Sequence, residues 1–254
     1  MKVLVTFALE NEFAPWKAMH DFTPGRWGER DAHLARIGGV LLGVLLTGAG
    51  PAHAGAATSA VFSREDAETL CISAGLAGAL KPSYRVGEVL AARSVISEAS
   101  GEGALSSPEL VSLAKDCGAT IVENFLTAGA AVATAESKAS LSARADAVEM
   151  ESFEILNRAA AMGFSRVAIR AVSDTCDEDL PLDMNRVFAE DGQVSVPRVL
   201  GQVARHPAAI AGLIRLAQNS KKAAESLARF LDSYIAAIAH TSNVSEAKSA
   251  ALAL

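Results

Sequence analysis

Short apolar runs of strand length recur along this chain, and they limit its fold more than any other feature. Residues 2–8 are almost continuously apolar, and residues 166–172 are rich in β-branched side chains. A strand that is apolar on both faces is typical of the centre of a sheet covered by helices on both sides. Further strands are predicted at residues 32–37, 40–47, 70–74, 86–92, 119–127 and 130–134. The sequence therefore predicts an α/β fold, a three-layer αβα domain with a central mixed β-sheet.

Helical patterns separate these runs and dominate the C-terminal part of the chain. Pro15 suits the first turn of a short helix that carries Trp16 and Met19. Ser107 and Pro108 form a good helix start, with Ser107 as the N-cap. Other helices are predicted at residues 52–59, 136–144, 151–162, 196–206, 207–218 and 221–239, and loops at residues 23–28, 75–80 and 97–107. We expect a single domain over residues 1–240 and a flexible C-terminal tail at residues 241–254.

Composition excludes several classes of function. Half of the 254 residues are hydrophobic and 20% are charged, which allows a large core. The net charge of −6 and the lack of basic clusters argue against a nucleic-acid partner. Cys71, Cys117 and Cys176 are widely spaced and include no CxxC pair, which indicates reduced thiols with a structural role in a cytoplasmic protein. No cofactor and no metal site is predicted.

One apolar stretch imitates a targeting signal. Residues 37–46 are followed by Ala52-His53-Ala54, which resembles the core and cleavage site of a signal peptide. The stretch begins far from residue 1, and it is too short and too rich in glycine for a membrane span. Two strands joined by a tight turn at Gly38-Gly39 explain it better. We therefore expect no membrane span.

Four acidic residues stand where predicted strands or helices end: Glu12, Glu149, Glu151 and Asp174. In α/β sheets, the carboxyl ends of strands are where ligands bind. Separated carboxylates in one cleft are what hydrolysis of a glycosidic bond requires, because one group handles the proton of the leaving group while another activates water. Taken singly, each acid is better explained by a solvated or capping role.

The sequence Gly48-Ala49-Gly50-Pro51 lies between a predicted strand and an alanine-rich helix. Such a turn can bind an anion at a helix N-terminus. It lacks the third glycine and the later acid of a dinucleotide fingerprint. A tight strand-to-helix turn explains the same residues equally well.

These motifs together resemble the nucleoside phosphorylase/nucleosidase superfamily, which has the purine nucleoside phosphorylase fold. The resemblance is nearest to 5′-methylthioadenosine/S-adenosylhomocysteine nucleosidases, with hopanoid-associated phosphorylases as close relatives. It is carried by the opening strand with residues 8–12, the turn at 48–50, the block at 73–88, and the pair Val148-Glu149-Met150-Glu151 and Arg170-Ala171-Val172-Ser173-Asp174. It implies a sheet that is partly barrel-like, a purine nucleoside as the small-molecule ligand, and a homo-oligomer, with a dimer favoured.

The resemblance also implies roles for individual residues. Glu12 is expected to activate water, and Asp174 to protonate N7 of the purine so that the base leaves neutral. Glu151 is expected to bind the ribose hydroxyls. Further substrate-binding residues are then Met150, Ser173, Arg170, Gly75 and Gly50, with Ser173 orienting Asp174. An ion pair between Arg170 and Glu149 is an equally good expectation for that arginine.

Departures from the family pattern leave the substrate and the nucleophile open. Residues 129–132 contain no aromatic side chain to stack on a purine, although Phe125 lies a few residues upstream. Acids in the opening loop favour water as the nucleophile. Phosphorolysis of an adenosyl group on a lipid is the main alternative, and a non-catalytic protein that binds or stores nucleosides is another. Arg26, Arg85 and Arg93 are candidate phosphate ligands, although a surface position explains each of them better.

Overall fold

The computed structural model describes residues 1–62 and 69–252, with side chains described as far as residue 241. Its sheet is built around β1 (Lys2–Phe7), which lies between β4 (Val40–Leu46) and β5 (Thr69–Ala79) and is parallel to both. On the other side of β5 lies β10 (Ser165–Asp174), again parallel. The carboxyl ends of these four strands therefore meet at one edge of the sheet.

Part of the sheet closes on itself. The pairings run from β5 to β9 (Ala147–Glu149), β8 (Thr120–Thr127) and β6 (Val89–Ser97), and then through β10 back to β5. This ring is a five-stranded barrel, as the resemblance implied. The small strand β7 (Gly103–Leu105) pairs with β6. Beyond β4 the sheet continues through β3 (Arg30–Ile37) to the edge strand β2 (Thr23–Trp27).

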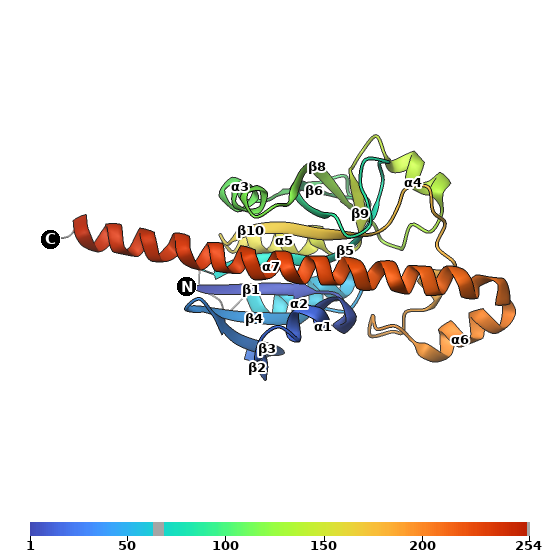
Figure 1. Cartoon of the computed structure of the whole chain (residues 1–254), viewed down its shortest axis with the longest axis horizontal. Coiled ribbons are helices and arrows are strands. Elements are labelled where there is room, and N and C mark those ends of the chain that lie inside the picture. The colour runs from blue at the N-terminus through green and yellow to red at the C-terminus, as the bar shows by residue number, and fades with distance from the viewer. Residues whose placement is uncertain (63–68, 253–254) are drawn as a thin grey trace.

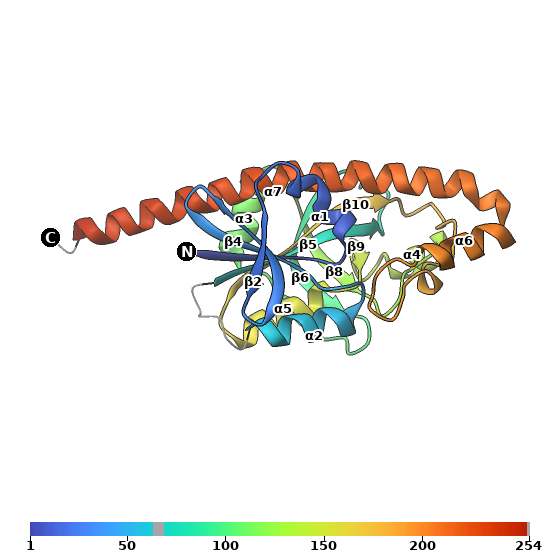
Figure 2. The ribbon, with the colours of Figure 1, turned by 90° about the horizontal axis from the view of Figure 1, so that it is seen from below.

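Helices cover both faces of the sheet, which confirms the three-layer prediction (Figures 1 and 2). Helices α2 (Pro51–Phe62) and α5 (Ser152–Ala161) lie on one face, where Phe62 and Leu156 join the core. On the other face, Trp16, Leu227 and Tyr234 fill the core. The helices on that face are α1 (Glu10–Lys17), α3 (Pro108–Asp116) and α7 (Ile210–Leu252).

The remaining helices lie near the carboxyl edge of the sheet. They are α4 (Ala135–Leu141), the short 3₁₀ helix η1 (Met184–Arg186), α6 (Val196–Arg205) and η2 (Pro207–Ala209). The long helix α7 runs the length of the molecule and projects beyond the sheet at its C-terminal end (Figure 1). Among the described helices, α7 included, none combines the length and the hydropathy needed to cross a bilayer.

The predicted hairpin over the apolar stretch is confirmed. Strands β3 and β4 pair antiparallel up to Ile37 and Val40, and Gly38 and Gly39 join them. Both glycines have positive φ angles, of 58° and 88°, which two-residue hairpin turns require and which side chains with a Cβ rarely adopt.

Several predicted boundaries are wrong. Residues 23–27 of the loop predicted at 23–28 form the edge strand β2, because an edge strand tolerates Pro24, which has no N–H to donate. Residues 130–134 are not a strand, because Thr134 caps α4 by accepting a hydrogen bond from the Ser137 N–H. Strand β5 continues through the small residues predicted as a loop, since the neighbouring strand β10 pairs with them as far as Gly78.

Helix termini also differ from the predictions. Helix α1 begins at Glu10, so Pro15 lies inside it. The Ser107 hydroxyl does not cap α3 but accepts a hydrogen bond from the Arg166 N–H, at 3.0 Å. The two helices predicted between residues 207 and 239 are one helix, because no glycine or proline interrupts that stretch after Gly212. Helix α7 continues to Leu252, and the flexibility expected from residue 241 stays a prediction.

Gly43 on β4 offers a test of how the edge of the sheet packs. A Cβ at this position would lie 2.1 Å from Cε3 of the buried Trp27 indole on β2. We expect Gly43→Ala to lower the free energy of unfolding by about 1–3 kcal/mol, because the indole has to shift. Urea denaturation monitored by circular dichroism measures the change. Gly201→Ala in α6 is the control, since no atom lies within 4 Å of its added Cβ; an equal loss in both variants would contradict this packing.

Candidate active site

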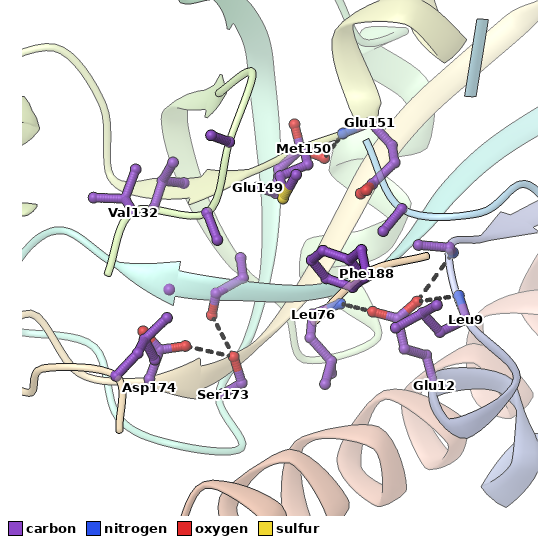
Figure 3. Close-up of a pocket in the computed structure, with 18 residues that line it drawn as sticks. Leu9, Glu12, Leu76, Val132, Glu149, Met150, Glu151, Ser173, Asp174 and Phe188 are labelled. Carbon is purple, nitrogen blue, oxygen red and sulfur yellow. Dashed lines mark hydrogen bonds between the residues drawn. The ribbon is translucent and has the colours of Figure 1, made fainter. Parts of the chain in front are cut away.

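A cavity of about 160 Å³ lies at the carboxyl edge of the sheet (Figure 3). Residues at or just beyond the ends of β1, β5, β9 and β10 form most of its wall, and two loops close it. The lining residues are Ala8, Leu9, Glu12, Ala49, Leu76, Ala77, Gly78, Ala130, Ala131, Val132, Val148, Glu149, Met150, Glu151, Ser173, Asp174, Leu180 and Phe188. The structure thus brings Glu12, Glu151 and Asp174 to one cavity.

Glu12 is held by three backbone amides. Its Oε2 accepts hydrogen bonds from the N–H groups of Ala8 and Leu9, at 3.0 and 3.1 Å, and its Oε1 accepts one from Leu76, at 3.1 Å. A carboxylate offers about four acceptor positions, so one remains for a ligand or water in the cavity. Burial raises the pKa of the Glu12 carboxyl, although the charge of Arg170 and the three amides oppose the shift.

Arg170 connects the acids from behind the cavity wall. Its guanidinium lies 2.5 Å from Glu149 Oε2 and 3.6 Å from Glu151 Oε2, and it donates to the Ser73 carbonyl at 2.9 Å. Glu149 also accepts hydrogen bonds from the Glu151 and Ser152 N–H groups and from the Thr127 hydroxyl. Glu149 is thus fully engaged by the protein, and its expected ion pair with Arg170 is present.

The pKa of Glu151 is also raised. Burial, the neighbouring carboxylate of Glu149 and, to a lesser degree, Glu12 raise its pKa to about 8, while Arg170 lowers it. Its Oε1 accepts a hydrogen bond from the Gly50 N–H at 2.9 Å. The turn predicted as an anion-binding site therefore binds a carboxyl group of the protein itself.

Asp174 is fixed by two donors. The Ser173 hydroxyl donates to Oδ1 at 2.7 Å, and the Lys138 ammonium lies 2.5 Å from Oδ2. Lys138 is fully buried and comes from α4. A buried lysine ammonium attracts a carboxylate strongly. The pair therefore places an ammonium directly beside the carboxyl group at the end of the cavity that Asp174 lines.

Two glycines on β5 make room for these acids. A Cβ on Gly78 would lie 2.8 Å from Asp174 Oδ2, and one on Gly75 would lie 3.3 Å from Glu12 Oε1. The small side chains of this segment therefore leave space for the carboxyl groups of the site.

The remaining predicted residues divide into two groups. Met150 and Ser173 line the cavity, whereas Arg170, Gly75 and Gly50 lie outside its lining. Phe125 is buried in the core under β8 and does not reach the cavity. None of the three arginines considered as phosphate ligands lines the cavity, and Arg93 instead pairs with the exposed Glu123.

Sequence reasoning missed Lys138, Gly78 and Phe188. Phe188 follows η1 and places its ring among Leu76, Met150 and Glu12 (Figure 3). It is the sole aromatic residue between Asp174 and Phe230 in the sequence, a signal that could have identified it. Lys138 offered no comparable signal, because it lies 36 residues before Asp174 in an unremarkable polar helix.

The described residues contain no cluster of three or more histidine, cysteine or acidic side chains arranged to hold a metal ion. The three cysteines are free, and burial raises the pKa of the Cys71 thiol to about 12, consistent with an inert structural role.

The raised pKa of Glu151 predicts how stability varies with pH. The folded protein keeps the Glu151 proton up to about pH 8, whereas the unfolded chain loses it near pH 4.5. Between these values the folded state binds more protons, so its free energy of unfolding falls as pH rises, by roughly 1.4 kcal/mol per unit at most. Glu151→Gln has no carboxyl group at this position, so we expect its free energy of unfolding to fall less between pH 5 and pH 8. The difference in free energy of unfolding, variant minus wild type, should therefore increase over this range.

Urea denaturation at several pH values measures this difference. Glu123→Gln is the control, because its carboxyl is 77% exposed. An advantage of Glu151→Gln that stays constant with pH would contradict the assignment.

Comparisons with known proteins agree with this fold. Futalosine hydrolase of Helicobacter pylori (a mutant) superposes with a TM-score of 0.70 at 18% identity, over 92% of this chain and 98% of that one. The 5′-methylthioadenosine/S-adenosylhomocysteine nucleosidase of Neisseria meningitidis, solved with methylthio-immucillin-A, gives 0.70 at 21% identity and the same coverage. The nucleosidase of Campylobacter jejuni gives 0.70 at 16%, over 93% and 99%.

A search of curated proteins gives no match. The model of the phosphorylase superfamily, however, matches residues 2–236, almost the whole of the described fold. The matched range includes every strand of the barrel and all four acidic residues that line the cavity. This chain belongs to the phosphorylase superfamily.

Proposed function

We propose that this protein cleaves the N-glycosidic bond of a purine nucleoside by hydrolysis. The observation that carries the proposal is the convergence of Glu12, Glu151 and Asp174 on one cavity. Family membership supports enzyme activity on nucleosides. The proposed substrate resembles methylthioadenosine or S-adenosylhomocysteine, because several structural neighbours are nucleosidases named after these two compounds.

In this proposal Glu12 is the general base. It takes a proton from a water molecule whose oxygen then bonds to C1′ of the ribose, and the electron pair of the C1′–N9 bond leaves with the purine. A carboxyl whose pKa is raised by burial suits this task better than an exposed one, because a base is most effective when its pKa approaches the working pH. The acceptor position left free by the three amides faces the cavity.

Glu151 binds the ribose hydroxyls, and Met150 packs against the sugar. With a pKa of about 8, Glu151 carries a proton near neutral pH and can donate a hydrogen bond as well as accept one. Its neutrality also limits the negative charge near Glu12. At the other end of the cavity, Asp174 delivers a proton to N7, so that the purine leaves as a neutral base; Ser173 orients it.

Water is favoured over phosphate because of the charge of the cavity. Among its lining residues in the described chain there is no lysine, arginine or histidine, while four are acidic. A phosphate would lie against these carboxyl groups without a cation to bind it, and phosphate sites normally supply arginine, lysine or free amides. Hydrolysis therefore fits this lining better than phosphorolysis.

The cavity of about 160 Å³ is smaller than the roughly 300–1,000 Å³ typical of small-molecule sites. Entry of a nucleoside consequently requires a shift of the wall. Leu180 and Phe188 are the lining residues to move, because they belong to the connection between β10 and α6 rather than to the sheet.

The test is a substrate screen with and without phosphate. We expect the protein to release a free purine from methylthioadenosine, S-adenosylhomocysteine, adenosine or futalosine, with free sugar as the second product in both buffers. Liquid chromatography identifies both products. Sugar 1-phosphate formed only with phosphate would favour phosphorolysis, and purine binding without turnover would favour a storage protein.

Two substitutions test the proposed roles. Glu12→Gln and Asp174→Asn should each lower kcat by about 10²–10⁴-fold, the usual contribution of a general base or acid. Glu10→Gln is the matched control, because Glu10 lies two residues away in α1 but is exposed and pairs with Lys17 at 2.9 Å. Full activity of Glu12→Gln would contradict its role as base.

A further inference from the structure

Behind Asp174 lies a buried cation that the cavity itself does not expose. The Lys138 ammonium has no solvent exposure, and its three protons have three acceptors. These are Asp174 Oδ2 at 2.5 Å, the Thr175 carbonyl at 2.7 Å and the Glu178 carbonyl at 3.0 Å. The ammonium therefore has a complete set of hydrogen-bond partners, as its burial requires.

The same contacts lock the carboxyl group of Asp174. Lys138 binds Oδ2, Ser173 binds Oδ1, and Gly78 lies so close to Oδ2 that a Cβ there would be at 2.8 Å. The carboxyl can neither rotate nor withdraw without breaking one of these contacts. Such a group is positioned before a ligand arrives, which is how polar groups contribute most to catalysis.

A second lysine–aspartate pair shows what a structural pair looks like in this protein. Lys81 lies 2.6 Å from Asp146, nearly the same distance. That lysine is 42% exposed, and Asp146 accepts hydrogen bonds from the Glu123 and Asn124 N–H groups rather than lining the cavity. The Lys138–Asp174 pair differs on both points, since its lysine is sealed and its carboxyl faces the cavity.

Of the two donors that bind the Asp174 carboxyl group, the Lys138 ammonium is a far stronger acid than the Ser173 hydroxyl. We propose that Lys138 is the positioning residue that supplies the purine-side acid, and that the proton delivered to N7 comes from the Lys138 ammonium by way of Asp174. Lys138 passes a proton to Oδ2, Asp174 passes one to N7, and the electron pair of the C1′–N9 bond is retained by the purine. Once the purine has left, water in the cavity returns a proton to Lys138 by way of Asp174, while Glu12 releases the one taken from water. This inference rests on the proposed function.

The contacts with Thr175 and Glu178 add a second consequence. Both carbonyls belong to the segment that leads from β10 to Leu180 on the cavity wall. Lys138 thereby links Asp174 to the chain segment between β10 and α6, which has to shift when a nucleoside enters. The proton donor and that part of the wall are held by one side chain.

The experiment compares Lys138→Met with Lys81→Met, which removes the structural pair. We expect Lys138→Met to lower kcat on a purine nucleoside by about 10²–10⁴-fold with a KM within a few-fold of the wild type, and Lys81→Met to leave both nearly unchanged. Calorimetric binding of adenine and of 7-deazaadenine, which has no N7 acceptor, gives a readout that does not need turnover. The wild type should prefer adenine by about 10- to 100-fold, and Lys138→Met should lose this preference.

A double variant guards against misfolding. Lys138→Met leaves Asp174 buried without its cation, whereas Lys138→Met with Asp174→Asn removes both charges. If Lys138 acts through Asp174, the double variant should be no slower than Asp174→Asn alone.

The proposal is overturned if Lys138→Met keeps its kcat and its preference for adenine, or if the effects of the two substitutions multiply. A wild type that turns over no nucleoside would contradict the proposed function instead, and the binding preference would still decide the role of Lys138.

Discussion

The buried guanidinium of Arg170 is the interaction on which the site depends. Three carboxyl groups surround it, those of Glu12, Glu149 and Glu151, and without a central positive charge they could not share so small a volume. Arg170 also binds the Ser73 carbonyl, so its side chain on β10 contacts the neighbouring strand β5. The same side chain therefore balances the charge of the acids and adds a contact between two strands of the barrel.

The site divides its charges between two ends of the cavity. Around Arg170 the carboxyl groups outnumber the cation. Burial raises the pKa of both Glu12 and Glu151, and the charge of Glu149 adds to the shift of Glu151. Around Asp174 there is one carboxyl for one ammonium. This arrangement suits a reaction in which Glu12 takes up a proton at one end of the cavity and Asp174 gives one up at the other. Carboxyl groups are in excess at the first end, whereas an ammonium accompanies the carboxyl group at the second.

Much of this arrangement could be predicted from the sequence, for a specific reason. Asp174 ends β10, and Glu12 and Glu151 lie five and two residues after the ends of β1 and β9; in α/β sheets such positions gather at one edge. Lys138 and Phe188 could not be predicted in the same way. Their places depend on how α4 and the connection after β10 pack against the sheet, which no local pattern of polar and apolar residues records.

The errors in secondary structure have a similar origin. Strand β2 exists because β3 offers it a partner, although its own sequence, Thr-Pro-Gly-Arg-Trp, is typical of a turn. The small residues of β5 form a strand because β1 and β10 pair with it and because the carboxyl groups above it need the space. In both cases a contact distant in sequence decides the local structure.

The acids of the cavity and its other lining residues belong to different parts of the fold, which affects how the substrate selectivity of such a protein can change in evolution. Every acid of the site is anchored at the end of a strand or at the start of a helix, whereas Ala130, Val132, Leu180 and Phe188 belong to connecting segments. Substitution or replacement of these connections would alter which molecules fit and leave the charged groups in place. Selectivity and chemistry can thus be inherited separately, and relatives with the same acids can differ widely in what they accept.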